Sequence, residues 1–180
     1  TDVAGNITTK DAADATLGTS LRLQVKEKVA PIIAITAPTA GTYLTNNKPT
    51  ITWKVTDTDS GVNPATIGIT IDGTKITGDS IAKTAITGGY QCTYTPATAL
   101  SDGSHTIKLD ASDYDGNAAG TSSTSFKVDT VPPTLTLSSP ADKLVTNVAS
   151  CTVKGTTNDV TSSPVTVTVK LNSKTAETVS

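Results

Sequence analysis

The sequence has few of the residues that build most active sites and large hydrophobic cores. Its 180 residues include one Trp, one Phe, four Tyr, one His, two Cys and no Met. No apolar run reaches the roughly 18 residues that a membrane-spanning helix needs, and no secretory signal peptide is recognisable. Because there is one histidine and no nucleophile motif, we expect a protein that is not an enzyme and binds no cofactor.

Charged residues are also scarce, and the two signs nearly cancel. The formal net charge is -2 and the isoelectric point is about 5.2. Without a basic patch there is no electrostatic basis for binding nucleic acid or an anionic membrane, so neither is expected as a partner. A composition rich in Thr, Ser, Asp and Gly, with Lys as the main cation, is typical of exported proteins. We therefore expect an extracellular, cell-surface location.

The sequence is rich in β-branched residues, which favour strands, and threonine is its most frequent residue. Short alternating runs separated by turns such as Asp72-Gly73 and Asp102-Gly103 predict an all-β sandwich, and no stretch keeps a helical period. The expected strands, each with its inward face, are 31–38 (Ile33, Ile35), 50–55 (Ile51, Trp53, Val55), 66–71 (Ile67, Ile69, Ile71), 90–95 (Tyr90, Cys92, Tyr94), 104–111 (His105, Ile107, Leu109, Ala111) and 124–129 (Phe126, Val128).

Two stretches of the sequence match each other. Residues 30–46 match residues 132–147, with a shift of 102 at the two aligned prolines, and beyond them the match continues at a shift of 100. The aligned pairs are Pro31 and Pro133, Pro38 and Pro140, Ile51 and Cys151, Lys54 and Lys154, and Asp59 and Asp159. Near the start, Gly5-Asn6 match Gly116-Asn117. Self-similarity of this kind predicts a tandem array of units of about 100 residues.

The repeat predicts three segments. Residues 1–28 are the C-terminal strands of an incomplete unit, 29–130 are a complete unit, and 131–180 are the N-terminal half of a following unit. The extra residues at 10–18 are expected to form a longer hairpin loop or a surface insertion. The link "DTVPP" at 129–133 holds two prolines, which fix φ and remove amide donors, so we expect a short and stiff connection.

Three motifs resemble the bacterial Ig-like domains that occur as tandem arrays in large surface-exposed and virion-associated proteins. They are "DTDSGVNPATIGITIDG" (57–73), "LSDGSHTIKLDASDYDGNAAG" (100–120) and "VDTVPPTLTLSSP" (128–140). The resemblance implies Ig-like sandwiches arranged end to end, with a role in distance, stiffness or adhesion and not in catalysis. The sequence departs from antibody domains in lacking their Cys-Trp-Cys arrangement, since Cys92 and Cys151 lie in different units.

Asp113, Asp115 and Asn117 alternate along one loop, and alternating oxygens of this kind suit a calcium ion. The matching loop near the start of the chain has Ala4 in place of Asp115, and no distal Glu completes an EF-hand. We interpret these residues as turn formers between two strands, with calcium binding as the open alternative.

Asp57 and Asp59 raise the same question in the loop after "TWKV". The second copy keeps one aspartate, Asp159, which the shift of 100 places on Asp59. A single shared aspartate is expected to hold the loop through hydrogen bonds to the backbone. A joint metal site with the Asp113 loop would require both loops at one end of the sandwich, and the sequence by itself predicts no metal residue.

The remaining candidates are better explained by packing than by chemistry. His105 is expected to be partly buried at the start of a strand, which places Asp110 on the opposite face. Cys92 and Cys151 occupy apolar-face positions and are expected to be small buried hydrophobes, not a disulfide between units. Trp53, at an inward position, is expected to pack in the core and not against a sugar.

We therefore expect a structural function, as a stiff extracellular spacer in a large repetitive surface protein, an adhesin or a surface filament. One alternative is an ancillary module of a secreted polysaccharide-degrading enzyme. Another is a filament subunit in which residues 19–27 complete the open edge of residues 131–180 by strand addition. The expected partners are neighbouring Ig-like units of the same or identical chains, and a surface receptor or glycan. Asn6-Ile7-Thr8 form a glycosylation sequon.

Overall fold

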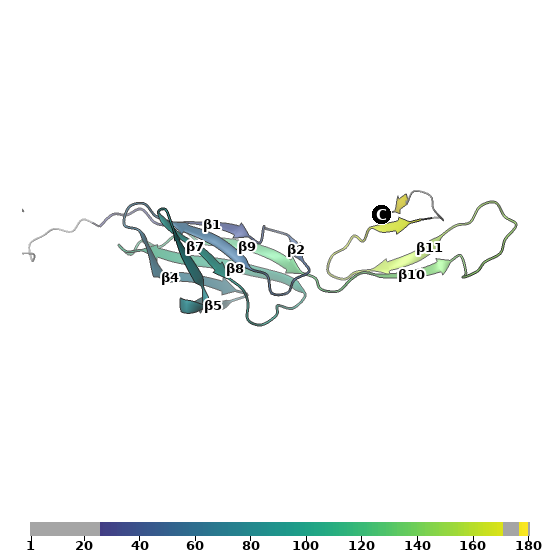
Figure 1. The fold of residues 1–180 in the computed structure, drawn as a ribbon, viewed down its shortest axis with the longest axis horizontal. Helices are drawn as coiled ribbons and strands as arrows, with labels where there is room; N and C mark the ends of the chain where they lie inside the picture. Colours follow the sequence, from purple (N-terminus) through teal and green to yellow (C-terminus); the bar gives the residue numbers. More distant parts are fainter. Residues whose placement is uncertain (1–25, 171–176, 180) are drawn as a thin grey trace, which may run out of the picture.

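The computed structural model describes residues 26–170 and 177–179. Its central domain is a sandwich of two sheets, with strand orders β1-β3-β7-β6 and β2-β9-β8-β4-β5 (Figure 1). The strands are β1 Ile32–Ala37, β2 Tyr43–Leu44, β3 Ile51–Thr56, β4 Val62–Ile71, β5 Thr74–Thr77, β6 Ala82–Ile86, β7 Gly89–Tyr94, β8 Gly103–Asp113 and β9 Ser122–Val128. The all-β sandwich expected from the sequence is confirmed. No helix in the described ranges is long and apolar enough to cross a membrane.

The core lies between the two sheets and is built from alternate residues of the central strands. Trp53 and Phe126 are its largest buried side chains, and β-branched residues fill most of the remaining space. Since side chains along a strand point alternately to the two faces, the period-two pattern identifies the inward face correctly. The buried apolar residues are Ile51, Trp53, Val55, Val62, Ile67, Ile69, Ile71, Ile81, Cys92, Ile107, Leu109, Ala111, Phe126 and Val128.

Three short strands were not expected from the sequence, and all three lie at a sheet edge. β2 and β5 are the outer strands of the five-stranded sheet, and β6 is an outer strand of the other sheet. β5 and β6 include exposed or half-buried lysines and no residue that is fully buried. Charged residues on edge strands oppose pairing with a second sheet, and they also weaken the alternation by which a strand is recognised.

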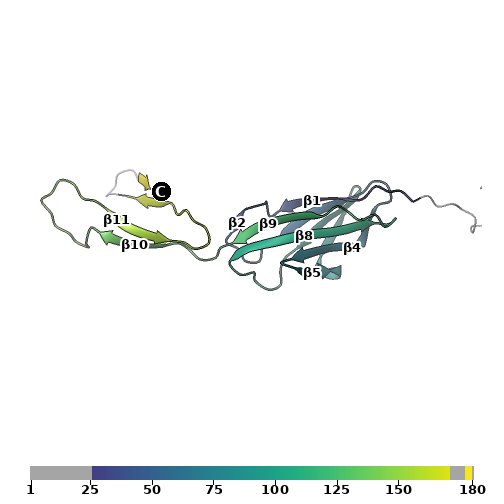
Figure 2. The same cartoon turned by 180° about the vertical axis from the view of Figure 1, so that it is seen from behind.

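The chain runs into the sandwich at one end and out at the other (Figure 2). Ile32 pairs with Thr56, so residues 26–31 approach β1 beside the last residue of β3. Gly103 pairs with Val128, so β9 ends beside the start of β8, and β8 runs back from there along the sandwich. We refer to these as the N-terminal end and the C-terminal end of the central domain.

Beyond β9 lie two small sheets, the pair β10 Thr134–Ser139 with β11 Lys154–Asn158 and the pair β12 Val167–Val169 with β13 Glu177–Val179. Several large apolar side chains of this part are exposed. They are Val131, Leu135, Leu137, Leu144, Val145, Val148, Val153 and Val160. This part therefore buries much less apolar surface among the described residues than the central domain does.

The β10–β11 pair repeats the register of the β1–β3 pair at a constant shift of 102, including a bulge near the end of the first strand. The equivalent pairs are Ile32–Thr56 with Thr134–Asn158, and Ile35–Trp53 with Leu137–Gly155. This corrects the shift of 100 inferred from the sequence for the second strand. Asp159 therefore occupies the position of Asp57, not that of Asp59.

Gly89 provides a test of the pairing between β3 and β7. A Cβ atom at Gly89 would lie 2.0 Å from the Val55 carbonyl oxygen, whereas nothing lies within 4 Å of a Cβ atom at Gly120. We predict that Gly89→Ala lowers the free energy of unfolding by about 3 kcal/mol, because the backbone of β3 must move. Gly120→Ala should change it by less than about 0.5 kcal/mol. Urea denaturation of both variants measures the difference, and equal stabilities would contradict the register in which Gly89 opposes Thr56.

Candidate functional site

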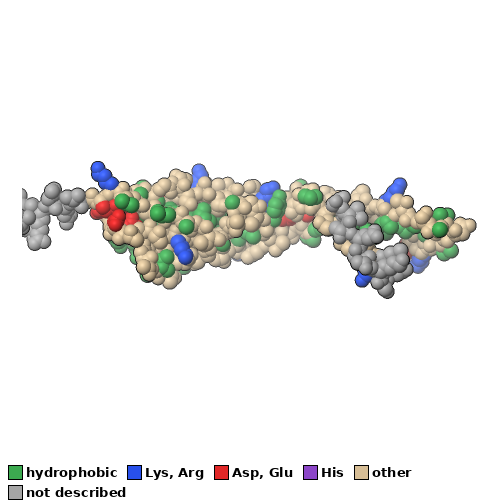
Figure 3. Space-filling model, turned by 90° about the horizontal axis from the view of Figure 1, so that it is seen from above, with side chains coloured by type: hydrophobic (Ala, Val, Ile, Leu, Met, Phe, Trp, Pro, Cys, Tyr) green, Lys and Arg blue, Asp and Glu red, His purple; other side chains and the backbone are tan. Residues whose placement is uncertain are grey.

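Three carboxylates from distant parts of the sequence meet at the N-terminal end of the central domain. Glu27 precedes β1, Asp57 follows β3, and Asp113 is the last residue of β8. One oxygen of each lies within 4.8 Å of the others. Figure 3 shows acidic side chains gathered at this end. The fold explains the meeting, because β3 and β8 both end here and residues 26–31 approach β1 beside them.

Asp113 is held in place by the loop that follows it. The Asn117 amide donates to Asp113 Oδ1 at 2.8 Å, and Asn117 Nδ2 donates to Asp113 Oδ2 at 2.6 Å. Gly116, with φ of 94°, supplies the left-handed residue of this tight turn. Burial favours the neutral form of Asp113, but the hydrogen bonds, chiefly from Asn117, outweigh it and lower its pKa to about 2. Asp113 is therefore a carboxylate at neutral pH.

Glu27 is tied to the two loops that flank it. Its amide donates to Asp115 Oδ2 at 2.9 Å, and its Oε1 accepts from Ser60 Oγ at 2.9 Å and from Asn117 Nδ2 at 3.1 Å. Its backbone oxygen accepts from the same Asn117 Nδ2 at 3.0 Å, and its Oε2 accepts from the Val29 amide. The segment before β1 is thus anchored to the end of the sandwich.

Asp57 has one oxygen that is satisfied and one that is not. Asp57 Oδ1 accepts the amides of Asp59 at 3.0 Å and Gly61 at 2.9 Å, which shapes the loop between β3 and β4. Asp57 Oδ2 is buried and has no hydrogen-bond partner, and the residue as a whole is 7% exposed. A buried carboxylate oxygen without a partner is costly, since it has lost the water that would solvate it.

The structure meets the condition that the sequence left open, because the Asp57 and Asp113 loops share one end of the sandwich. Asp59 is not part of the cluster through its side chain, which is exposed. Asp115 binds the Glu27 amide instead of lining the cluster with Asp113. As expected, Asp113 and Asn117 form a turn. The alternation of Asp113, Asp115 and Asn117 does not, however, identify which carboxylates meet in the cluster.

Glu27 was missed by the sequence analysis, although a signal for it exists. Glu27 and Asp129 both stand four residues before a proline, Pro31 and Pro133, near the start of the two matching stretches of sequence. Their side chains act alike, since Asp129 Oδ1 accepts the Val131 amide in the same way that Glu27 accepts the amide two residues on. Asp129 is itself buried.

His105 lies near the C-terminal end of the domain, far along β8 from the acidic cluster. It is buried, and its Nδ1 lies 2.6 Å from Asp72 Oδ2 while its Nε2 lies 2.7 Å from the Ser101 carbonyl oxygen. Since both nitrogens face acceptors, only the doubly protonated ring can donate to both. Burial opposes this, but the bonds to Asp72 and Ser101 and the charge of Asp72 raise the pKa of His105 above 6.5. The histidine is buried near the start of its strand, as expected.

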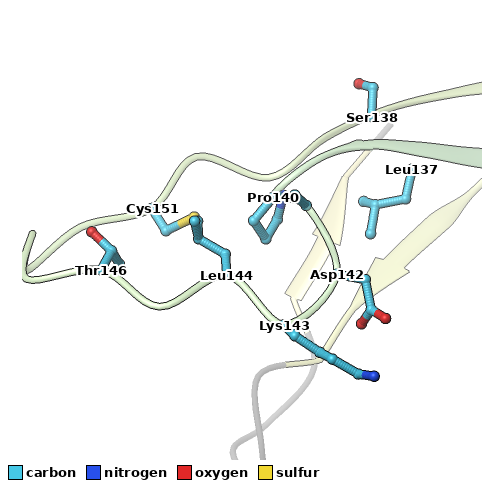
Figure 4. A pocket seen from close by; sticks show the side chains of 9 residues that line it. Leu137, Ser138, Pro140, Asp142, Lys143, Leu144, Thr146 and Cys151 are labelled. Atoms are coloured by element: carbon cyan, nitrogen blue, oxygen red, sulfur yellow. The ribbon is translucent and has the colours of Figure 1, made fainter.

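The two cysteines differ in environment. Cys92 is buried in β7 as expected, and burial, partly offset by the charge of Lys83, raises its pKa to about 11. Cys151 is exposed and precedes β11, so the expectation of a buried strand residue was wrong. Figure 4 shows it beside Leu144 and Pro140 in an open hollow next to β10. Both are free thiols, and Trp53 is fully buried in the core as expected.

Several expectations concern residues outside the described ranges. They are the sequon at 6–8, the insertion at 10–18, the alternating strand at 19–25 and the loop around Ala4. These stay predictions, and so do the three-segment division of the chain and its tandem arrangement.

Comparison with known proteins agrees with this architecture. Residues 31–109 match the family described as bacterial Ig domain. The central domain is Ig-like. Residues 133–179 match the family described as glucodextranase, domain B. No curated protein matches the chain. The matches connect the chain with modules of ancillary or structural role.

Solved structures with a similar fold come from several bacteria. CopC from Methylosinus trichosporium OB3b is 20% identical, with 54% of this chain and 94% of that chain covered and a TM-score of 0.40. Dimeric latent PorU from Porphyromonas gingivalis is 22% identical over 62% of this chain and 12% of that chain, with a TM-score of 0.47. The fibronectin(III)-like modules of CbhA from Clostridium thermocellum are 22% identical over 54% and 96%, with a TM-score of 0.39. Likenesses this low say nothing about function.

The His105–Asp72 pair predicts how stability depends on pH. Below pH 6.5 the histidine is protonated in both the folded and the unfolded chain, and the pair contributes fully. As the pH rises through the raised pKa of the folded state, the proton is lost and the free energy of unfolding falls. Asp72→Asn should flatten this decline, because asparagine tolerates the positive φ of 47° at this position but carries no charge.

Urea denaturation between about pH 6 and pH 9 measures this decline. Asp110→Asn is the matched control, since Asp110 pairs with Lys75 at 3.1 Å while both side chains are at least half exposed. It should leave the decline in place and change stability by less than about 1 kcal/mol. If the free energy of unfolding fell equally with pH in the native chain and in Asp72→Asn, the His105–Asp72 pair would not be the cause of the decline.

Proposed function

We propose that the protein is a non-catalytic structural module, a stiff spacer in a large extracellular surface protein such as an adhesin or a surface filament. The match of residues 31–109 to bacterial Ig domains and the internal similarity of the chain support a repeated Ig-like unit. The neighbours of the unit are then its main partners. The observation that carries the proposal is the hydrogen bonding of the backbone amides in the junction between β9 and β10.

Every backbone amide of that junction is hydrogen-bonded. The bonds join the Asp129 amide to the Leu44 oxygen at 2.9 Å, the Thr130 amide to Asp102 Oδ1 at 3.0 Å, and the Val131 amide to Asp129 Oδ1 at 3.2 Å. Thr130 Oγ1 also donates to Asp102 Oδ1 at 2.9 Å. Pro132 and Pro133 follow, with no amide hydrogen and with φ fixed by their rings.

These bonds restrain the junction as far as Val131, and the two proline rings fix φ beyond it, which supports a stiff link. A hinge at Thr130 would have to break its bonds to Asp102, each of which contributes about 1 kcal/mol or more. Bending one residue earlier would pull Asp129 out of its buried position. The central domain also adds length, because the 11 residues of β8 span about 36 Å at roughly 3.3 Å per residue.

Distance distributions between spin labels test the stiffness. In a Cys151→Ser background, labels at Thr84→Cys in β6 and Thr157→Cys in β11 report on the two sides of the junction, and buried Cys92 should stay unlabelled. We predict one narrow distribution in double electron–electron resonance. Replacing Pro132 and Pro133 by glycine should broaden it, because two φ angles are freed.

The control pair places both labels in the central domain, at Thr84→Cys and Lys108→Cys. Its distribution should be narrow with either junction, because the sandwich itself is unchanged. A broad distribution across the native junction, together with a narrow control, would contradict the stiff spacer.

A second candidate is an ancillary module of a secreted polysaccharide-degrading enzyme. The match of residues 133–179 to domain B of glucodextranase favours it. Against sugar binding by the chain itself, the exposed tyrosines of the described residues, Tyr43 and Tyr114, lie at opposite ends of the central domain and form no stacking strip.

Affinity electrophoresis separates the two candidates. We predict that the chain migrates equally in plain gels and in gels that contain dextran or starch, because it offers no aromatic platform. A mobility lowered by either glucan, relative to a non-binding reference protein, would favour the enzyme module over the spacer.

A further inference from the structure

We infer that the cluster of Glu27, Asp57 and Asp113 binds a calcium ion at the N-terminal end of the central domain, with Asn117 completing the site. The site joins the segment before β1 to the loops after β3 and β8. Calcium binding at this site does not depend on the proposed function. Only the idea that the ion stiffens a junction rests on the proposed role as a spacer.

The spacing of the oxygens suits calcium. Calcium takes oxygen ligands at about 2.3–2.6 Å, so two ligands of one ion lie up to about 5.2 Å apart. One oxygen from each of the three carboxylates falls within that separation of the others. Magnesium needs shorter bonds, of about 2.0–2.1 Å, and a regular octahedron, which a cluster from three separate segments is less suited to provide.

The unpartnered oxygen of Asp57 points to a cation. Asp57 Oδ1 is occupied by two amides, while Oδ2 is buried without any hydrogen bond. An orphaned buried oxygen in a native protein needs an explanation, and a bound ion is one of the usual ones. Loop formation alone requires only Oδ1, so it does not account for the burial of Oδ2.

No basic side chain compensates the cluster among the described residues. The ion pairs there join Lys75 to Asp110 and His105 to Asp72, away from it. Lys26 and Lys28 flank Glu27 in the sequence. Lys26 Nζ donates to the Asp115 backbone oxygen, and Lys28 is exposed. Carboxylates this close repel one another unless a cation or a proton lies between them.

Asn117 Nδ2 stands among three oxygens that could all bind an ion. It donates to the Glu27 backbone oxygen, to Glu27 Oε1 and to Asp113 Oδ2. Carboxylate and backbone carbonyl oxygens are the ligands that calcium prefers. Rotating the side-chain amide by half a turn would present Asn117 Oδ1 in place of the donor, which adds a further oxygen to the set.

The two carboxylates at the start of the central unit recur at the start of the next. Asp129 stands where Glu27 does, and Asp159 stands where Asp57 does. Asp159 Oδ1 accepts the Thr161 amide at 3.0 Å, as Asp57 Oδ1 accepts the Asp59 amide.

The other part of the cluster recurs as well. The matching loop near the start of the chain keeps Asp113 and Asn117, as Asp2 and Asn6, and of the three oxygen-bearing residues it changes only Asp115. Since Asp115 does not line the cluster, its replacement by Ala4 is no argument against calcium. The residues that recur are therefore those that meet in the cluster, Asp113 and Asn117, and not every alternate residue along the loop.

Calorimetry tests the site on the full chain after treatment with EDTA. We expect CaCl2 to bind with one-site stoichiometry and to raise the melting temperature by mass action, and MgCl2 to bind at least about tenfold more weakly. Asp57→Asn keeps the shape of the side chain but removes its charge, and should weaken calcium binding by about tenfold or more. Asp59→Asn, an exposed carboxylate two residues away, is the matched control and should bind calcium as the native chain does.

Circular dichroism first establishes that each variant is folded, and Asp113→Asn provides a second variant if Asp57→Asn is not. The absence of both binding heat and a thermal shift at about 10 mM calcium would overturn the proposal. Equal affinities of Asp57→Asn and Asp59→Asn would overturn it too, by placing the ion elsewhere. Calcium binding by a chain whose β9–β10 junction is flexible would leave the site intact and contradict only the spacer.

Discussion

The pairing of β1 with β3 is the constraint on which the rest of the structure depends. Opposing Ile35 and Trp53 sets Trp53 inward, in the centre of the core, and opposing Ile32 and Thr56 brings the segment before β1 beside the loop after β3. The first contact contributes stability through burial. The second places Glu27 next to Asp57, so the acidic cluster is a direct result of the register that packs the core.

The sequence predicts the central strands because their burial is one-sided, whereas the edge strands and the cluster leave no comparable pattern. The repeat shift shows the limit clearly. Shifts of 100 and 102 differ by two positions, which keeps every side chain on the same face of a strand, so alternation cannot separate them. The register of the β10–β11 pair distinguishes the two shifts. It aligns Asp159 with Asp57 and not with Asp59. Glu27 escaped notice because its partners lie far away in sequence.

The carboxylates at the two ends of the central domain have different kinds of partners. At the C-terminal end, Asp72 is paired with His105, and Asp102 accepts the amide and hydroxyl of Thr130. At the N-terminal end, three carboxylates meet, and amides and hydroxyls satisfy all of their oxygens except one. Neutral donors satisfy geometry but do not cancel charge. A cation bound at the N-terminal end would therefore offset negative charge that the hydrogen bonds leave in place.

Asp129 links the central domain to the segment that leads into β10. Its amide is bonded to Leu44 in the central domain, while its carboxylate occupies the position that Glu27 has at the preceding junction. One residue thus ends the central domain and begins the segment that leads to β10. Of the three carboxylates in the cluster, Glu27 alone belongs to the segment before β1, while Asp57 and Asp113 lie at the ends of β3 and β8. An ion would add to the hydrogen bonds that already anchor this segment to the sandwich. Calcium would therefore act on the direction in which the chain approaches the domain, and leave the core unchanged.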